Sequence, residues 1–453
     1  MKRTLYVLLS LLVLASVAIS ACGAQATPTA APLPAATEAP AATAAPAATE
    51  APAATSAPAQ PASKVVTIGF TTSQTGSLNV ESTRQYNGLK LWMDQVNKAG
   101  GIKLADGTVV TFKAQTYDDE SNKDRVQQLY TKLATEDNAD FLISPYSSGL
   151  AAAASVIAQQ YNKIMITTGA ADDANQKKGY TLVYQAYTPA SQYLTGALDL
   201  LAATDPAVKK IAIAYSTDAF STSVVAALKT YAEGKGYNVV YYEGYDPATT
   251  DFSAMINKIQ AAAPDAVMGG GHFQDGTTFA KQLAEKKVGA KFVALLVAPP
   301  EDKFSQLGDA ALGVTGPSQW EPQVNFTQDS ATKAGLPWYG ISGADFTSAY
   351  KAAYNENPTY HSAGGYVAAL ILQKAIEDAG TLDTAAVAAA LDKMDILTFF
   401  GHIKFDASAA SHGLQLGHQM VYVQWQKDAS GTFGKQIVWP AEGATAPVLY
   451  PIP

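Results

Sequence analysis

The feature that most constrains the fold of this chain is an alternation of short apolar runs with longer amphipathic segments. Residues 65–70 form an apolar, β-branched run, and a glycine-bearing loop follows at residues 71–76. Residues 86–98 then place apolar side chains at helical spacing. Because this order of strand, loop and helix recurs along the chain, it predicts parallel sheets with helices on both faces.

The alternation comes in two series. The first is predicted to continue with strands at 109–117, 141–143 and 164–166 and helices at 122–136 and 151–161. The second begins after residue 184 and is predicted to contain strands at 211–214, 239–242, 266–268 and 292–297 and helices at 221–235, 252–263 and 277–287. Ligands of such sheets bind where the carboxyl ends of strands meet helix N-termini. We therefore expect an α/β protein with two doubly wound, Rossmann-like lobes and a ligand cleft between them.

Length and charge agree with this expectation. The segment from residue 64 to residue 453 is too long for one core of ordinary size and suits two lobes. The formal net charge is −8 and the sequence pI is near 5.2. Because no basic face is evident, we expect no nucleic-acid partner.

The N-terminus has the pattern of an export signal at residues 1–21. Lys2 and Arg3 precede an apolar run at residues 5–19, and small residues follow. A membrane-spanning helix would need about 20 apolar residues with polar flanks. The last four residues, Ile19-Ser20-Ala21-Cys22, resemble the bacterial lipobox, which implies acylation of Cys22; an ordinary signal peptide is the alternative.

Cys22 is the only cysteine, so no intramolecular disulfide and no Cys-based zinc site is expected. The rest of segment 22–63 consists almost entirely of Ala, Pro, Thr and Ser. Such a stretch has no large apolar side chain to bury, and its prolines favour extended conformers. We therefore expect a disordered tether. No second apolar span follows in the sequence, which disfavours a receptor with a second transmembrane segment and a cytoplasmic output domain.

Five segments of the remaining chain resemble the leucine/isoleucine/valine-binding family of extracytoplasmic solute receptors. They are VTIGFTTSQTGSL, ISPYSSGLAAAASVIAQQYNKIMITTGAAD, YQAYTPASQYLTGALDLL, DFSAMINKIQAAAPDAVMGGGHFQDG and GVTGPSQWEP. The resemblance spans residues 64–453 and implies the type I periplasmic-binding architecture. It also implies discontinuous lobes: 64–184 with 317–395, and 185–316 with 396–453. Helices at 344–354 and 365–379 would belong to the first lobe.

The resemblance implies a lipid-anchored, extracytoplasmic, monomeric binding protein without cofactor or metal. It would close around a small polar solute, a branched-chain or other neutral amino acid, and deliver it to the permease and ATPase of an ABC transporter. One alternative is a sensor of the same fold that binds urea, an amide or an aromatic acid. Another is a lipid-anchored hydrolase, but the five histidines form no HExxH pattern and SPYSSGL is not a GxSxG elbow.

Two serines follow the predicted strand at 141–143. Ser147 and Ser148 precede an alanine-rich helix, where a hydroxyl and free backbone N–H groups make a carboxylate site. From spacing alone, either serine could instead be only the helix cap. The resemblance implies that Ser148 binds the carboxylate of the solute.

The loop after the next strand contains Gly169, Ala170 and Ala171. In the family that this chain resembles, a threonine at the position of Ala171 contacts the solute through its hydroxyl. The resemblance also implies that the backbone carbonyl of Gly169 accepts a hydrogen bond from the ammonium of the solute. This chain lacks that hydroxyl, so the backbone groups of the loop would have to bind the solute.

The second series of strands supplies further candidates. Phe220 matches a position where the family places an aromatic ring against the solute, although a core aromatic is the alternative. Gly271 and His272 belong to a glycine-rich loop that lacks the Lys and Ser/Thr of a phosphate-binding P-loop. We expect both to line the cleft.

An ammonium group removed from water needs an anionic partner. Glu301 roughly matches the family's acidic residue, and Asp275 is its competitor; either could be a solvated surface charge. Tyr187 and Trp320 fall near the predicted lobe crossings. Each could form a wall of the cleft or pack the hinge, and for Trp320 we expect packing.

Overall fold

The computed structural model describes residues 62–453. The predicted export signal, the lipidation site Cys22 and nearly all of the predicted tether lie outside the described residues. The described chain forms two large sheets and one two-stranded sheet.

The first sheet has the order β2-β3-β1-β4-β5-β6, and only the β2–β3 pair is antiparallel. Its strands are β1 (Ser63–Thr72), β2 (Ile102–Lys103), β3 (Val109–Asp118), β4 (Phe141–Ile143), β5 (Met165–Thr167) and β6 (Val183–Gln185). The helices connecting them are α1 (Asn79–Lys98), α2 (Lys123–Thr135), α3 (Ser148–Gln160) and α4 (Asp173–Gln176). Strands β4, β5 and β6 are buried along their whole length, as parallel strands covered on both faces must be.

The second sheet has the order β15-β14-β11-β10-β9-β7-β8. Its strands are β7 (Lys210–Ser216), β8 (Asn238–Tyr245), β9 (Ala266–Gly270), β10 (Phe292–Leu295), β11 (Thr315–Ser318), β14 (Val421–Lys427) and β15 (Phe433–Trp439). The helical segments around it are α5 (Thr195–Thr204), α6 (Ala219–Gly234), α7 (Ser253–Ala262), α8 (Phe273–Glu285) and η2 (Asp302–Ala311). Strands β14 and β15 extend the parallel part in the antiparallel direction.

The parallel parts of both sheets share one strand order. If the parallel strands of each sheet are numbered 1 to 5 along the chain, they lie side by side in the order 2-1-3-4-5. This order is β3-β1-β4-β5-β6 in one sheet and β8-β7-β9-β10-β11 in the other. In this arrangement the ligand crevice lies at the carboxyl ends of the strands, beside the first and third strands. The predicted α/β fold with two doubly wound sheets is confirmed.

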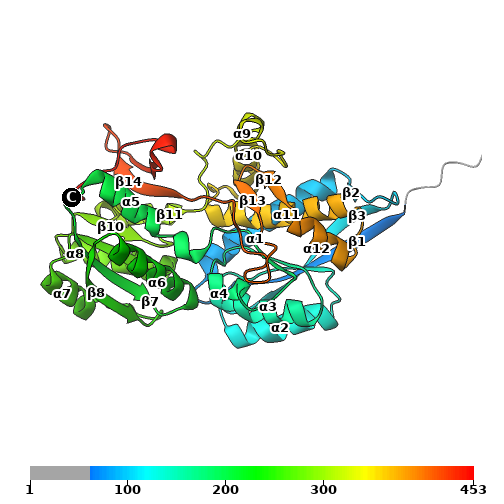
Figure 1. Cartoon of the computed structure of the whole chain (residues 1–453), viewed down its shortest axis with the longest axis horizontal. Coiled ribbons are helices and arrows are strands. Elements are labelled where there is room, and N and C mark those ends of the chain that lie inside the picture. Colours follow the sequence, from blue (N-terminus) through cyan, green and yellow to red (C-terminus); the bar gives the residue numbers. More distant parts are fainter. Residues whose placement is uncertain (1–61) are drawn as a thin grey trace, which may run out of the picture. The chain divides into compact units, whose positions relative to one another are not determined.

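Helix α11 (Tyr360–Ala379) packs along α1, although the two are far apart in sequence (Figure 1). The contact is close because glycines face it: a Cβ at Gly88 would collide with the carbonyl of Ser362, and a Cβ at Gly365 with that of Gln85. Helices α10 (Gly343–Tyr354) and α12 (Thr384–Asp392) pack beside this pair. Helix α9 (Gln328–Ala334), strands β12 (Asp395–Leu397) and β13 (His402–Lys404), and the short η1 (Ala190–Gln192) and η3 (Ala441–Gly443) complete the described elements.

Three predicted helices begin four or more residues too late. Helix α1 starts at Asn79 rather than at residue 86, α8 at Phe273 rather than at residue 277, and α11 at Tyr360 rather than at residue 365. Residues 79–85 carry no apolar stripe, because polar side chains such as Glu81 and Arg84 are buried there instead. Strands β6, β11, β14 and β15 were not predicted by the alternation.

A polar cluster ties together the segments that run between the two sheets. The N–H of Thr188 donates to Gln319 Oε1 at 3.0 Å, and the Thr188 hydroxyl lies 2.7 Å from His418 Nδ1. His418 Nε2 lies 3.0 Å from the carbonyl of Phe400, which can only accept. Nε2 therefore carries the proton and Thr188 donates to Nδ1. The predicted lobe boundaries stay a prediction.

Candidate functional site

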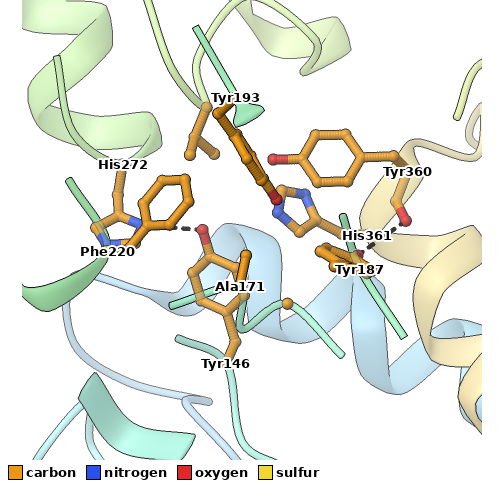
Figure 2. Close-up of a pocket in the computed structure, with 10 residues that line it drawn as sticks. Tyr146, Ala171, Tyr187, Tyr193, Phe220, His272, Tyr360 and His361 are labelled. Carbon is orange, nitrogen blue, oxygen red and sulfur yellow. Dashed lines mark hydrogen bonds between the residues drawn. The ribbon is translucent and has the colours of Figure 1, made fainter. Parts of the chain in front are cut away.

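A small cavity lies where loops of the two sheets meet. Its volume is about 10 Å³, room for roughly one water. Figure 2 shows Phe220 and His272 on one side, Tyr187, Tyr360 and His361 on the other, and Tyr146 and Tyr193 between them. The wall is completed by Gly169, Ala171 and Val297.

The first sheet supplies the floor of the cavity through the loops after β4 and β5. Tyr146 follows β4, and Gly169 and Ala171 follow β5. Gly169 has φ +63°, and a Cβ at this position would lie 2.5 Å from the ring of Tyr146. Position 169 therefore requires glycine for a steric reason, because any side chain there would collide with the ring of Tyr146.

His272 is the charged group of the cavity wall. Its Nδ1 lies 2.8 Å from Tyr146 Oη, and its Nε2 lies 3.5 Å from Asp218 Oδ1. Burial alone would lower the pKa of His272, but the carboxylates of Asp218, Glu81 and Asp275 outweigh burial and raise this pKa to about 9. A protonated ring has only donors. Tyr146 therefore accepts from His272 and keeps its own hydroxyl hydrogen free to donate.

Glu81 fixes the N-terminus of α8. Its carboxylate is fully buried and accepts from the N–H of Phe273 at 2.9 Å. An anion at a helix N-terminus is stabilised by the free N–H groups and the helix dipole. Because α1 belongs to the first sheet and α8 to the second, this bond spans the cavity region.

Glu301 is completely buried and does not line the cavity. Its carboxylate forms an ion pair with Arg84 of α1 and lies 2.7 Å from His361 Nδ1 at the start of α11. Arg84 also lies 3.6 Å from Glu356. Glu301 thus joins the loop after β10 to two helices packed on the first sheet, and its direct contact with a solute stays a prediction.

The two predicted serines have different surroundings. Ser147 is the N-cap residue of α3, but its side chain makes no capping hydrogen bond. The Ser148 hydroxyl accepts from the N–H groups of Ala171 and Asp172 at 3.0 and 3.2 Å, which ties the two loops of the first sheet together. Neither serine lines the cavity. Binding of the solute carboxylate by Ser148 stays a prediction.

The other predicted residues lie in the wall of the cavity or close to it in the sequence, except Trp320. Phe220 and Tyr187 line the cavity, whereas Ala170 is buried beside it. Gly271 is not among the lining residues, and a Cβ there would collide with the carboxylate of Asp275. The ring centroid of Trp320 lies 5.4 Å from that of Phe346 and 5.7 Å from that of Phe399, and its place at a hinge stays a prediction.

Five polar or aromatic residues around the cavity were not predicted from the sequence: Glu81, Tyr146, Tyr193, Tyr360 and His361. Tyr146 lies directly after a predicted strand, so its position alone could have identified it. Tyr193 lies in a crossing segment, and Tyr360 and His361 begin a helix far along the chain, where no strand end marks them.

Across residues 62–453, no three His, Cys, Asp or Glu side chains are grouped so that they could hold a metal ion. In the described part of the chain, no helix combines the length and the apolar character needed to cross a membrane.

Two doubly wound sheets with a small cavity at their strand ends define a two-lobed solute receptor. Residues 65–431 match the periplasmic binding protein family, and the chain belongs to that family. This match confirms the predicted type I periplasmic-binding architecture.

Relatives with curated names include Leu/Ile/Val-binding protein homolog 7 of Brucella suis. It is 26% identical over 378 residues, which cover 81% of this chain and 90% of that protein. Homolog 8 of Brucella abortus is 24% identical over 392 residues, covering 83% and 91% of the two chains.

Solved structures share the fold. The branched-chain amino acid transporter substrate binding protein LivJ of Streptococcus pneumoniae, in complex with isoleucine, has a TM-score of 0.67 at 20% identity, covering 83% of this chain and all of that one. An ABC transporter solute binding protein of R. palustris, in complex with benzoate, has a TM-score of 0.67 at 19% identity, covering 85% and 98%.

Proposed function

We propose that this periplasmic binding protein captures a small solute bearing a carboxylate and delivers it to the permease of an ABC uptake transporter. The observation that carries the proposal is the cavity at the strand ends of both sheets, with the Tyr146–His272 pair in its wall. The hydroxyl of Tyr146 accepts from the charged His272, so its own hydrogen is available to a solute carboxylate.

A neutral amino acid is the first candidate solute. The relatives are named Leu/Ile/Val-binding proteins, and a solved structure of the same fold holds isoleucine. An aromatic acid is the second candidate, because five of the lining residues are tyrosines or phenylalanine. Aromatic rings pack well against another ring, and a solved structure of the same fold holds benzoate.

Capture requires the lobes to move. A cavity of about 10 Å³ is far smaller than a leucine or a benzoate. The solute therefore enters a more open arrangement, and contacts with residues of both sheets shift the equilibrium toward closure. We propose that the lobes comprise residues 64–184 with 317–395 and residues 185–316 with 396–453. The packing of α11 on α1 and the pairing of β14 with β11 support this division.

The test of this proposal is a thermal-shift screen of the full chain with L-leucine, L-isoleucine, benzoate, 4-hydroxybenzoate, glucose and adenosine. A ligand that binds only the folded state raises the melting temperature. We expect a shift with at least one carboxylate solute and recovery of that solute unchanged, as for a binding protein without enzymatic activity. A shift with glucose or adenosine alone contradicts the solute class.

Transport is distinguished from sensing by uptake. Deletion of the gene should abolish uptake of the identified radiolabelled solute, and the intact gene should restore it. Normal uptake in the deletion strain contradicts the transport role and favours a sensor.

We further propose that Cys22 is acylated and holds the protein on the outer face of the cell membrane. The support is the lipobox-like sequence before the only cysteine. Cys22→Ala should release the protein from membranes or block its maturation, as seen by detergent partition. Normal processing and unchanged partition of the variant contradict lipidation.

A further inference from the structure

His361 has one ring nitrogen bonded to a buried carboxylate and one without a partner. The residue is fully buried and lines the cavity. Its Nδ1 lies 2.7 Å from Glu301 Oε1, whereas its Nε2 is buried and makes no hydrogen bond within the described residues. Buried polar atoms without a partner are rare in folded proteins and need an explanation.

The partner of Nδ1 determines where the proton of the ring lies. Glu301 forms an ion pair with the guanidinium of Arg84, and an ionised carboxylate only accepts hydrogen bonds. The Nδ1 atom must therefore carry the hydrogen. Burial lowers the pKa of His361 to about 3; the carboxylate of Glu81 opposes this shift, and the charges of Arg84 and His272 add to it. In the neutral ring Nε2 then carries a lone pair.

The ring of His361 lies among aromatic side chains of the cavity wall (Figure 2). Its centroid is 5.1 Å from that of Tyr146 in an edge-on arrangement and 3.9 Å from that of Tyr360. The cavity thus brings together a donor, the hydroxyl of Tyr146, and an acceptor, Nε2 of His361. A solute whose surface there is only hydrocarbon leaves the acceptor unpaired, which costs free energy.

We propose that His361 selects the solute by accepting a hydrogen bond at Nε2 from an N–H or O–H group. This rests on the proposed function and narrows its solute class to carboxylates that also carry a donor, such as the ammonium of an amino acid or the hydroxyl of a hydroxylated aromatic acid. Glu301 and Arg84 are positioning residues, because they hold the proton of His361 on the nitrogen that faces away from the solute.

The first test needs no solute. Nitrogen-15 NMR of histidine-labelled full-length protein distinguishes a ring nitrogen with hydrogen from one without, and His361→Phe assigns the signals of His361. We expect hydrogen on Nδ1 and a bare Nε2 at neutral pH. Hydrogen on Nε2 overturns the proposal.

The second test uses matched solutes that differ in the donor: L-leucine with 4-methylpentanoate, and 4-hydroxybenzoate with benzoate. In at least one pair, the donor-bearing solute should bind the wild-type protein about 10-fold or more tightly. In His361→Phe this ratio should fall below about 3-fold. Lys427→Ala is the control, since it removes an exposed ion pair outside the cavity wall and should leave both affinities and their ratio unchanged.

The outcomes separate the two proposals. An undiminished preference in His361→Phe, or equal binding of both members of every pair by the wild-type protein, overturns the role of His361. If none of the four solutes binds the wild-type protein, the proposed carboxylate class fails, and the NMR result still decides the state of His361.

Discussion

At the scale of single residues, the cavity contains two buried histidines in opposite states. Carboxylates surround His272 and raise its pKa to about 9, whereas burial and neighbouring positive charges lower the pKa of His361 to about 3. The two rings therefore contribute to stability in different pH ranges, because each departs from the ordinary histidine pKa of about 6.5 in its own direction.

The free energy of unfolding should depend on pH accordingly. The contribution of His272 is fully present below about pH 6.5 and is lost as the pH rises toward 9, a change on the order of 3 kcal/mol. The contribution of His361 is present above about pH 6.5 and is lost as the pH falls toward 3. Urea unfolding between pH 4 and pH 10 measures both slopes. His272→Gln should flatten only the alkaline slope, and an unchanged alkaline slope in this variant would refute the assignment.

Ser148 and Ser147 form a matched pair for mutation. Ser148→Ala removes the acceptor of two buried N–H groups, those of Ala171 and Asp172, and should lower the free energy of unfolding by about 1 to 3 kcal/mol. Ser147→Ala should change this free energy by less than about 0.5 kcal/mol, because its side chain makes no capping bond. Chemical denaturation compares the two variants. If Ser148→Ala weakens solute binding and leaves stability unchanged, the serine acts on the solute and not on the loops.

At the scale of elements, the crossing of α1 and α11 positions His361 and Arg84. The helices approach so closely that Gly88 and Gly365 each lie against a carbonyl of the other helix. Since α1 also carries Glu81, this crossing holds three of the buried charged or polar groups of the site. The positions of these side chains around the cavity therefore depend on how the two helices cross.

Gly88→Ala should prevent this close approach. The new methyl group would meet backbone rather than a flexible side chain, so we expect a loss of about 3 kcal/mol or more, or no folding at all. Gly149→Ala in α3 is the control: nothing lies within 4 Å of its Cβ, and it should stabilise the protein by about 0.5 to 1 kcal/mol. The melting temperatures of both variants, measured by thermal unfolding, test this expectation. Equal melting temperatures would contradict the packing described.

The sequence predicted elements with regular patterns and missed elements defined by long-range contacts. The strands and helices of both series were predicted because apolar periodicity marks them, and the family resemblance pointed to Gly169, Ala171, Phe220 and His272, which line the cavity. His361 could not be placed in this way, because it reaches the cavity through the packing of α11 on α1. Glu301 was predicted as a solute contact, which stays a prediction; its bond to His361 could not be predicted, because that bond depends on the same packing.

At the scale of the whole described molecule, four contacts around the cavity join elements of the two sheets. They are the bond from Phe273 to Glu81, the pair of Tyr146 and His272, and the contacts of Glu301 with Arg84 and His361. The described arrangement is thus closed by the protein's own side chains, and a solute adds to these contacts.

Arg84→Met should weaken closure. It leaves Glu301 buried without its cation, which costs about 3 to 5 kcal/mol in the closed arrangement and favours opening, where water reaches the carboxylate. Small-angle X-ray scattering should show a larger radius of gyration for the variant than for the wild-type protein. Lys427→Ala, which removes an exposed pair with Asp309, is the control and should leave the radius unchanged. An unchanged radius in Arg84→Met would show that this ion pair does not control closure.

Capture of a carboxylate solute in the cavity is measured by calorimetric titration of the full chain with L-leucine, L-isoleucine, benzoate and 4-hydroxybenzoate, repeated on Ala171→Phe. Ala171 lines the cavity, so a ring at this position occupies the space of the solute. We expect one solute per wild-type chain, with a Kd of about 1 µM or tighter, and no binding to a folded Ala171→Phe protein. Equally tight binding by the variant, or no binding of any of the four solutes by the wild-type protein, would contradict this expectation.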